Sequence, residues 1–358
     1  MKVRSIELKD YRNYPAARFE FRDGVNIIQG ANAQGKTNLL EAIYYCSIGK
    51  SLRVSREKEV IRFGCDKAKI LLQLERKYKK TQIMLLFSRT EKKTIKLDNI
   101  PIKRIGELMG EFYAVYFSPD EMKLIKESPE DRRRFMDIHI SQTSKQYFYF
   151  LGRYEKILAN RNKLLKTQTD VNIIKDTIDI WDRQLIEVGT KIIHMRNVFV
   201  DNLAPYVQKC HAYLTQDNEE LMIEYTGVKS HDLNEIRDSF EKKIKQSFDK
   251  DIKLGYTTIG PHRDDIKVVL NGVDIRLYGS QGQQRTAALS LKLAELEIMY
   301  QETGEMPVLL LDDVLSELDQ TRRERLLKFC TKAQTFITGT DFPQNPAYTY
   351  YNIFGGTR

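Results

Sequence analysis

The sequence predicts an α/β fold with mixed sheets and an inserted helical arm domain, and three features of the chain lead to this prediction. A short apolar strand at residues 25–28 runs into a glycine-bounded loop that opens a helix. A second apolar strand, MPVLLLDD at residues 306–313, ends in two acids. Between them, from Pro119 to about Leu203, apolar residues recur at helical spacing. The helical part is therefore expected to interrupt the α/β part.

The chain has 358 residues, of which 41% are hydrophobic and 30% are charged, a composition typical of a soluble protein with two domains. Its four cysteines are widely spaced and form no CxxC pair, so we expect neither a disulfide framework nor a zinc site, and a cytoplasmic location. No apolar run reaches the ~18 residues that a membrane helix needs. The start, MKVRSIELKD, alternates like a strand and does not resemble a signal peptide. We therefore expect no membrane association.

The charge is unevenly distributed along the chain. The net charge is +9, but residues 50–104 alone carry 17 lysines and arginines against 6 aspartates and glutamates, and the remainder is slightly acidic. A polyanion such as nucleic acid is therefore a candidate partner. A modest excess of lysine is also common in ordinary enzymes.

The loop GANAQGKT at residues 30–37 fits the pattern GxxxxGK[ST], which binds nucleotide phosphates. The glycines let backbone N–H groups curl around the phosphates, Lys36 reaches the β- and γ-phosphates, and the hydroxyl of Thr37 ligates Mg²⁺. Arg53 lies about a helix length further on, where it could fold back onto the nucleotide or simply face solvent. The loop predicts ATP or GTP, and the nucleotide-binding candidates are Gly30, Ala31, Asn32, Ala33, Gln34, Gly35, Lys36, Thr37, Asn38 and Arg53.

Strands are predicted on both sides of this loop. Residues 1–28 contain two alternating runs separated by the turn-like YRNYP. Residues 67–100 predict a β-meander, because the runs ILLQL, QIMLLF and TIKLD alternate with basic connections. Lysines in these connections could bind nucleic-acid phosphates, or equally protect a solvated sheet edge from aggregation. The candidates for DNA binding are Lys77, Lys79, Lys80, Lys92 and Lys93.

The middle of the chain predicts two long amphipathic helices that pack as an antiparallel pair, with TQTDVN at the tip and Pro205 closing the segment. Residues 220–278 predict mixed structure, including the strand LMIEY and a helix at 233–248. The polar loop TTIGPHRDD suggests a metal site at first sight, but one histidine followed by arginine is poor ligand spacing. We therefore set the metal interpretation aside.

The last third of the chain supplies two further motifs. Ser280, Gly282 and Gln283 lie in a loop that opens a long helix, and a helix N-terminus with serine and glycine favours an anion. The strand at 306–313 ends in Asp312, placed to hold the Mg²⁺ shell, and Asp313, placed to orient an attacking water. SELD at 316–319 is expected to cap a helix that starts at Gln320, and QTFITGT to form the last core strand.

The order of these motifs resembles an ATPase head of the ABC type, with an LSGGQ-like SQGQ at 280–283 between the phosphate loop and the acidic strand. The helical insertion resembles the SMC-like branch, although this arm is too short for a long coiled coil. Within that branch the chain resembles the RecF family of bacterial recombination mediators. The stretches that carry this resemblance are LKDYRNY with GANAQGKTNLLEAIY, SPDEMKLIKESPEDRRRFMD at 118–137 and LLLDDVLSELDQTRRERLL at 309–327.

The resemblance implies a slow, DNA-stimulated ATPase that uses ATP and Mg²⁺, forms an ATP-dependent homodimer and clamps duplex DNA near single-strand gaps. It implies RecR and RecO as partners in loading RecA onto single strands coated by SSB, in DNA repair, replication restart and the SOS response. The catalytic roles would belong to Lys36, Asp312 and Asp313, with Thr37 and Asp312 on the metal. The residues expected to act on the nucleotide of the other subunit are Ser280, Gln281, Gly282, Gln283, Ser316 and Asp319.

The sequence also departs from the family pattern. Gln281 replaces the second glycine of the ABC signature, and Glu127 stands where the family usually has glycine. Asp313 replaces the usual catalytic glutamate, and its shorter side chain favours a long-lived ATP state over rapid turnover. The switch histidine is absent, and Thr340 or Asp341 would have to sense the γ-phosphate.

We expect three parts: an N-terminal half of the head at 1–120, a helical arm at 121–219, and a C-terminal half of the head at 220–358. Two other classes of protein remain as alternatives. The helical insertion with its arginine run at 132–134 disfavours an ATPase subunit of a transporter. A P-loop kinase is disfavoured because it needs no signature loop from a second subunit. Size-exclusion chromatography with and without ATP, and ATPase rates with and without DNA, would separate the three classes.

Overall fold

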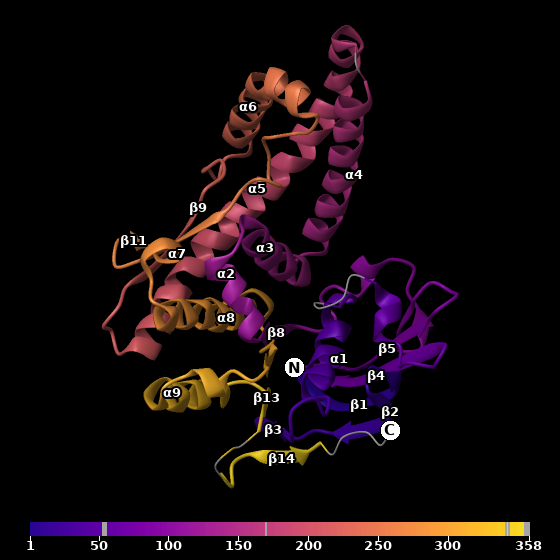
Figure 1. The fold of residues 1–358 in the computed structure, drawn as a ribbon, viewed down its shortest axis with the longest axis vertical. Helices are drawn as coiled ribbons and strands as arrows, with labels where there is room; N and C mark the ends of the chain where they lie inside the picture. Colours follow the sequence, from indigo (N-terminus) through magenta and orange to yellow (C-terminus); the bar gives the residue numbers. More distant parts are fainter. Residues whose placement is uncertain (52–55, 169, 341, 343, 354–358) are drawn as a thin grey trace. The chain divides into compact units, whose positions relative to one another are not determined.

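The computed structural model describes residues 1–51, 56–168, 170–340, 342 and 344–353, and the fold is mixed α/β, as predicted. The chain divides into two compact units, which Figure 1 shows coloured along the sequence. The first unit contains Met1–Met122, Cys210–Asn218 and Arg285–Arg358. The second unit contains Lys123–Lys209 and Glu219–Gln284. The division into a head of two halves and an arm stays a prediction.

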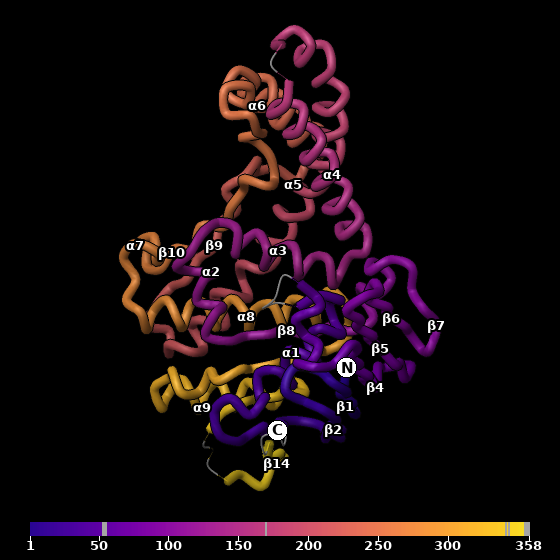
Figure 2. The backbone as a smooth tube through the Cα atoms, turned by 45° about the vertical axis from the view of Figure 1, so that its right-hand side comes forward, coloured from indigo at the N-terminus to yellow at the C-terminus, as the bar shows by residue number. Residues whose placement is uncertain are grey.

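An antiparallel sheet forms the N-terminal part of the first unit, in the strand order β2-β1-β4-β5-β6-β7. Buried and less buried residues alternate along β5, which is the pattern of a strand with one face on a core. The meander predicted for residues 67–100 is confirmed, and Figure 2 shows β4, β5, β6 and β7 following one another. The strands are β1 (Lys2–Tyr11), β2 (Tyr14–Glu20), β4 (Lys67–Glu75), β5 (Lys80–Ser88), β6 (Thr94–Leu97) and β7 (Ile100–Pro101).

A parallel sheet forms the centre of the first unit, in the order β14-β3-β13-β12-β8. Its strands are β3 (Val25–Gln29), β8 (Ala114–Phe117), β12 (Val308–Leu311), β13 (Thr335–Gly339) and β14 (Thr349–Asn352). All residues of β8, β12 and β13 are buried, so they read as continuous apolar runs. The carboxyl ends of parallel strands share one edge, which brings the segments after β3 and β12 together.

The predicted core strand at QTFITGT is confirmed as β13, in the middle of the sheet. A further strand, β14, follows it and pairs with β3, and the sequence did not predict this strand. The edge strand β14 is only partly buried, so its sequence TYYN lacks the apolar run that marks the inner strands.

Helix α1 (Lys36–Ile48) begins directly after the phosphate loop and is buried on almost every side. Glycines in the left-handed region bound it, with φ of +108° at Gly35 and +69° at Gly49. The predicted helix start at Gln320 is confirmed, because Asp319 caps α9 (Gln320–Cys330). The first unit also contains η1 (Glu57–Val60), η2 (Ile105–Glu107), η3 (Pro119–Met122), η4 (Leu315–Glu317) and most of α8 (Gln281–Thr303).

The second unit is mostly helical. Helices α4 (Lys145–Thr167) and α5 (Val171–Thr215) form the predicted antiparallel pair (Figure 1), linked by an ion pair of 2.6 Å between Arg161 and Asp182. Its other helices are α2 (Lys123–Lys126), α3 (Pro129–Thr143), α6 (Leu233–Leu254) and α7 (Ile275–Tyr278). A small antiparallel sheet consists of β9 (Leu221–Tyr225), β10 (Ile266–Leu270) and β11 (Val273–Asp274).

Pro205 was expected to close the helical segment, but it lies inside α5, which continues to Thr215. A proline in a helix removes one backbone hydrogen bond and crowds the preceding turn. Leu203 and Val207, on either side of Pro205, are completely buried. Their packing offsets the lost hydrogen bond. The helix therefore continues past Pro205, although a proline usually ends a helix.

Within the part of the chain that the structure describes, none of the helices combines enough length and apolar character to cross a membrane. All four cysteines are free thiols, as their spacing suggested.

Candidate nucleotide-binding site

Two glycines shape the loop between β3 and α1, because neighbouring atoms leave no room for a side chain. A Cβ atom at Gly35 would lie 2.5 Å from Nδ2 of Asn13, and the φ of +108° is itself unfavourable for other residues. A Cβ atom at Gly30 would lie 2.5 Å from the carbonyl oxygen of Ile353. Gly30 is therefore required by the close approach of the backbone at Ile353, and Gly35 by its own backbone conformation and the side chain of Asn13.

Lys36 is a buried cation at the start of α1. Its Nζ donates to the carbonyl oxygens of Gly30 at 2.6 Å and Ala31 at 3.0 Å, and the residue is 8% exposed. No carboxylate of the described residues forms an ion pair with it. A buried ammonium group without an anion is unfavourable, so this environment suits a bound phosphate group.

Asp312 follows β12 and accepts hydrogen bonds from three hydroxyl groups, although it is 5% exposed. Oδ1 accepts from Thr37 at 3.0 Å and from Thr338 at 2.7 Å, and Oδ2 accepts from Tyr116 at 2.9 Å. The carboxylate of Asp312 and the hydroxyl of Thr37 are hard oxygen ligands of the kind that Mg²⁺ uses together with substrate phosphates. No group of three or more His, Cys, Asp and Glu side chains that could hold a metal by itself occurs among the described residues.

Thr338 links the two acids after β12, and sequence reasoning missed it. Besides donating to Asp312, its Oγ1 accepts from the backbone N–H of Asp313 at 2.9 Å. Asp313 is exposed, has a left-handed φ of +54°, and its carbonyl oxygen accepts from Ser316 Oγ at 3.0 Å. Aspartate tolerates this backbone conformation better than most residues, which gives a physical reason for aspartate instead of glutamate. The signal in the sequence was weak, because Thr338 is one of two threonines in the buried strand β13.

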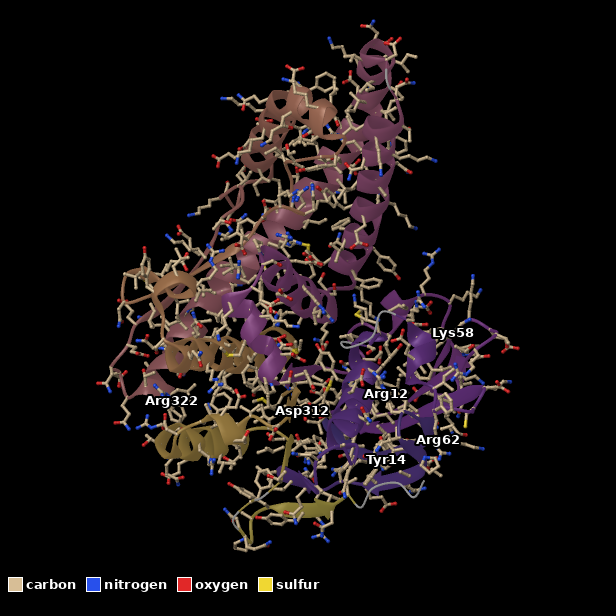
Figure 3. The ribbon with its side chains drawn as sticks, in the orientation of Figure 1. Arg12, Tyr14, Lys58, Arg62, Asp312 and Arg322 are labelled. Carbon is tan, nitrogen blue, oxygen red and sulfur yellow. The ribbon has the colours of Figure 1, made fainter. Side chains whose placement is uncertain are left out.

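The turn between β1 and β2 supports the phosphate loop, a role that its sequence did not reveal. Tyr14 Oη donates to the carbonyl oxygen of Gly35 at 3.0 Å, and Asn13 Nδ2 donates to that of Gln34 at 2.9 Å. Arg12 makes two 3.0 Å hydrogen bonds to the carboxylate of Glu41 on α1. Arg12 and Tyr14 are labelled to the right of Asp312 in Figure 3. The β1–β2 turn of the N-terminal sheet therefore stabilises the backbone of the phosphate loop.

The remaining nucleotide-binding candidates have different positions. Gln34 Oε1 accepts from the N–H of Ala31 at 3.2 Å, and Asn38 donates to Asn13 Oδ1 at 2.8 Å. Ala31, Asn32 and Ala33 are exposed. Of the two residues considered in place of a switch histidine, Thr340 is exposed. Arg53 and Asp341 lie outside the described residues.

The signature segment belongs to the second unit, whereas the phosphate loop belongs to the first. Ser280 and Gln283 cap the start of α8 reciprocally, with Ser280 N–H donating to Gln283 Oε1 at 2.9 Å and Gln283 N–H to Ser280 Oγ at 3.3 Å. Ser280, Gln281 and Gly282 are exposed. In the first unit, Asp319 caps α9 and pairs with Arg322 at 2.6 Å.

The five candidate DNA-binding lysines do not form one patch. Lys77, Lys79 and Lys80 lie at the β4–β5 turn, whereas Lys92 and Lys93 lie beyond the other end of β5. At about 3.3 Å per residue, the nine residues of β5 separate the two groups by roughly 30 Å. Lys79 pairs with Glu111 at 2.8 Å, and Lys93 donates to the carbonyl oxygen of Gly49 at 2.7 Å and pairs with Glu57. Lys77, Lys80 and Lys92 are exposed.

The arginine run on α3 belongs in part to the interior of the second unit. Arg132 is 5% exposed and pairs with Asp265 at 2.6 Å. Arg133 donates to the carbonyl oxygen of Asp264 at 2.9 Å. The carboxylate of Asp265 therefore anchors α3 through Arg132, whereas the carboxylate of Asp264 accepts a hydrogen bond from Tyr225 Oη.

A phosphate loop on a parallel sheet, an acidic strand end beside it and an inserted helical pair define an SMC-type P-loop head. The family described as the RecF/RecN/SMC N-terminal domain matches residues 2–341. Within this class, the chain belongs to the RecF family.

The relatives match over nearly their whole length. The DNA replication and repair protein RecF of Ruminiclostridium cellulolyticum is 43% identical over 346 residues, which cover 95% of this chain and 93% of that protein. The RecF protein of Lachnoclostridium phytofermentans is 41% identical and matches 100% of this chain and 99% of its own. A solved structure of the recombination mediator RecF with ATP superposes with a TM-score of 0.91 at 39% identity, covering 99% of this chain and 96% of that one. An Smc head from Pyrococcus furiosus shares the fold, with a TM-score of 0.55 at 15% identity over 99% of this chain and 94% of that one.

Proposed function

We propose that the protein is a slow, DNA-stimulated ATPase that dimerises on binding ATP and acts as a recombination mediator in cytoplasmic DNA repair. The observation that carries the proposal is the arrangement around Asp312, where hydroxyl groups from three segments converge on one buried carboxylate beside the buried Lys36. The solved RecF relative with ATP supports the choice of nucleotide.

In the proposed site, each residue has one task. Lys36 and the loop N–H groups bind the phosphates, and Thr37 with Asp312 holds Mg²⁺, which neutralises charge that develops during phosphoryl transfer. Asp313 accepts a hydrogen bond from the attacking water and orients it. Thr338 fixes both acids, since it donates to Asp312 Oδ1 and accepts from the N–H of Asp313. Hydrolysis by a short aspartate on an exposed turn would be slow.

The exposed signature residues support the proposal of a dimer, because a loop that acts on the nucleotide of another subunit has to be accessible. Ser280, Gln281, Gly282 and Gln283 would contact that nucleotide, together with Ser316 and Asp319. In the solved relatives RecF is described as part of the RecFOR pathway. We extend this to RecO and RecR as partners of this chain in loading RecA, on duplex DNA next to single-strand gaps.

The lysines at both ends of the β4–β5 hairpin would bind DNA phosphates. Their separation of roughly 30 Å corresponds to about nine base pairs at a rise of 3.4 Å. Lys77, Lys80 and Lys92 would contact DNA directly, because they are exposed and form no ion pair with the described residues. Lys79 and Lys93 would mainly support the fold through their pairs with Glu111 and Glu57.

The test is a pair of measurements on the full chain: the oligomeric state with and without ATP, and the rate of ATP hydrolysis with and without duplex DNA. We expect ATP to convert monomers to dimers and DNA to raise the rate. The matched control is Lys36→Met, which should remove tight ATP binding and with it dimerisation. A constant monomer that phosphorylates a small molecule would favour the kinase, and an ATPase indifferent to DNA would favour the transporter subunit.

A further inference from the structure

Phe63 is the most exposed large apolar side chain of the described residues, with 98% of its surface accessible to solvent. It occupies the second position of a turn in which the N–H of Cys65 donates to the carbonyl oxygen of Arg62 at 3.1 Å. Gly64 at the third position has a φ of +80°, as a type II turn requires. Single exposed apolar residues are common on protein surfaces, so exposure alone carries no conclusion.

The turn that displays Phe63 is anchored on both sides. The N–H of Arg62 donates to the carbonyl oxygen of Asp10 at 2.8 Å, and the thiol of Cys65 donates to Asp10 Oδ1 at 3.3 Å. From the other side, Arg89 Nε donates to the carbonyl oxygen of Cys65 at 2.7 Å. A turn held in this way presents its tip with little further loss of entropy on binding.

Cations are in excess around this turn. Residues 56–67 and 88–93, which meet here, carry seven lysines and arginines against four aspartates and glutamates. Both segments line an open hollow of about 590 Å³, whose charged residues are four cations (Arg56, Lys58, Lys92 and Lys93) and two carboxylates (Glu57 and Glu91). An aromatic ring among cations is the combination that binds nucleic acid through stacking and phosphate contacts.

The other end of the same sheet provides a comparison. Tyr78 is 87% exposed at the tip of the β4–β5 hairpin. There, however, Arg76 pairs with Glu111 at 3.1 Å and with Glu305 at 2.9 Å, and Lys79 also pairs with Glu111. Carboxylates of the protein thus neutralise part of that hairpin. Near Phe63, Glu57 pairs with Lys93, but Lys58, Arg62 and Lys92 form no ion pair with the described residues, so the turn at Phe63 is the better site for a polyanion.

We propose that Phe63 stacks on the terminal base at a junction between duplex and single-stranded DNA, while Lys58 and Arg62 bind the adjoining phosphates. In Figure 3 both cations lie toward the right-hand edge of the first unit. A junction exposes a base face without further unstacking, whereas continuous duplex does not. Phe63 would therefore confer a preference for gap edges that phosphate contacts alone cannot supply. This inference rests on the DNA-binding function proposed above.

The test uses the full chain with ATP and a duplex with a single-stranded overhang that carries 2-aminopurine at the junction. Phe63→Ala should bind this DNA roughly tenfold more weakly than the wild type and lose the stacking quench of 2-aminopurine fluorescence. Its salt dependence should be unchanged, because no phosphate contact is removed. Phe63→Trp should retain both affinity and quench, and Tyr78→Ala, at the other end of the sheet, is the matched control that should retain the quench.

Two failures are distinguishable. If the wild type binds DNA in the presence of ATP and Phe63→Ala has the same affinity and quench, the stacking role is wrong while the proposed function stands. An acidic protein partner would then be the better occupant of this surface. If the wild type shows no ATP-dependent DNA binding, the proposed function fails and this inference fails with it. Because Phe63 is exposed, an unchanged Tm in Phe63→Ala shows that any loss is local.

Discussion

At the scale of single residues, the proposed ATP hydrolysis depends on how the two acids after β12 are held. Asp312 is buried and fixed by three hydroxyl groups, whereas Asp313 is exposed on a left-handed turn. Thr338 is bonded to both, through the side chain of one and the backbone of the other. Loss of its hydroxyl should therefore disturb the reaction more than nucleotide binding.

Thr338→Val should lower kcat for ATP hydrolysis about tenfold, the equivalent of one or two buried hydrogen bonds. The affinity for ATP should change little, because Lys36 and the phosphate loop remain. Thr338→Ser keeps the hydroxyl and should restore most of kcat. Steady-state kinetics with an equilibrium ATP titration measure this split, and an equal loss in the valine and serine variants would show that Thr338 acts only through packing.

Asp313→Asn should abolish hydrolysis and leave an ATP-bound dimer that persists on DNA. Asparagine has nearly the same shape and also tolerates the left-handed backbone at this position, but it cannot act as the water-orienting carboxylate. The lifetime of the dimer after removal of free ATP, measured by size-exclusion chromatography, tests this. Dissociation as fast as in the wild type would mean that Asp313 does not limit the closed state.

His262 should make the stability of the protein sensitive to mild acid. Burial lowers the pKa of His262 from 6.5 to about 4. His262 Nε2 lies 3.0 Å from the carbonyl oxygen of Thr257, which can only accept, so Nε2 carries the proton of the neutral ring. His262 Nδ1 then accepts a hydrogen bond from Tyr154 Oη at 2.8 Å. The unfolded chain gains a proton near pH 6.5 while the folded chain does not, so stability present above pH 6.5 is lost as the pH falls toward 4.

The contribution of His262 to the free energy of unfolding should fall by roughly 2 kcal/mol between pH 7 and pH 5, and by at most about 3 kcal/mol at lower pH. The free energy of unfolding in urea should be compared at pH 7 and pH 5 for the wild type and His262→Gln. The variant should be less stable at pH 7 but lose about 2 kcal/mol less on acidification. The same pH dependence in both proteins would contradict the neutral, buried histidine.

At the scale of elements, the sequence predicted those whose signal is local. The phosphate loop, the strand before Asp312 and the start of α9 follow from glycines, apolar runs and caps that are neighbours in the chain. The turn that braces the loop through Asn13 and Tyr14 was missed, because its hydrogen bonds join residues separated by 21 positions. The strand β14 and the continuation of α5 past Pro205 were also missed, because tertiary packing determines both.

The candidate DNA-binding lysines were also predicted from local sequence alone. They were treated as one group because they are close in the chain, but strand β5 separates them into two groups. Replacing Lys77, Lys80 and Lys92 by glutamate should reduce the slope of log affinity for duplex DNA against log salt by roughly one for each DNA phosphate that is no longer neutralised. ATP hydrolysis without DNA should be unchanged, because these residues are far from Asp312 in sequence and form none of its hydrogen bonds. An unaltered slope would move the DNA surface to another part of the protein.

At the scale of the whole molecule, the residues proposed for one reaction are divided between two units of the same chain. The phosphate loop and Asp312 belong to the first unit, and Ser280 and Gly282 to the second. Motif order was enough to predict this set of residues and the RecF family. It could not say whether the signature loop serves its own chain or another one, because spacing along a chain does not determine which copy a loop contacts.

Complementation between two inactive variants tests the central claim most directly. Lys36→Met lacks a working phosphate loop, and Ser280→Arg should bind ATP but block the loop that reaches the other subunit, so each alone should hydrolyse almost nothing. If the loop acts between subunits, neither variant should dimerise alone, whereas a mixed dimer contains one complete site out of two. An equal mixture should therefore recover ATP-dependent dimers and at most about half of the wild-type DNA-stimulated rate. A mixture as inactive as its two parents, under conditions where sedimentation shows mixed dimers, would contradict the account.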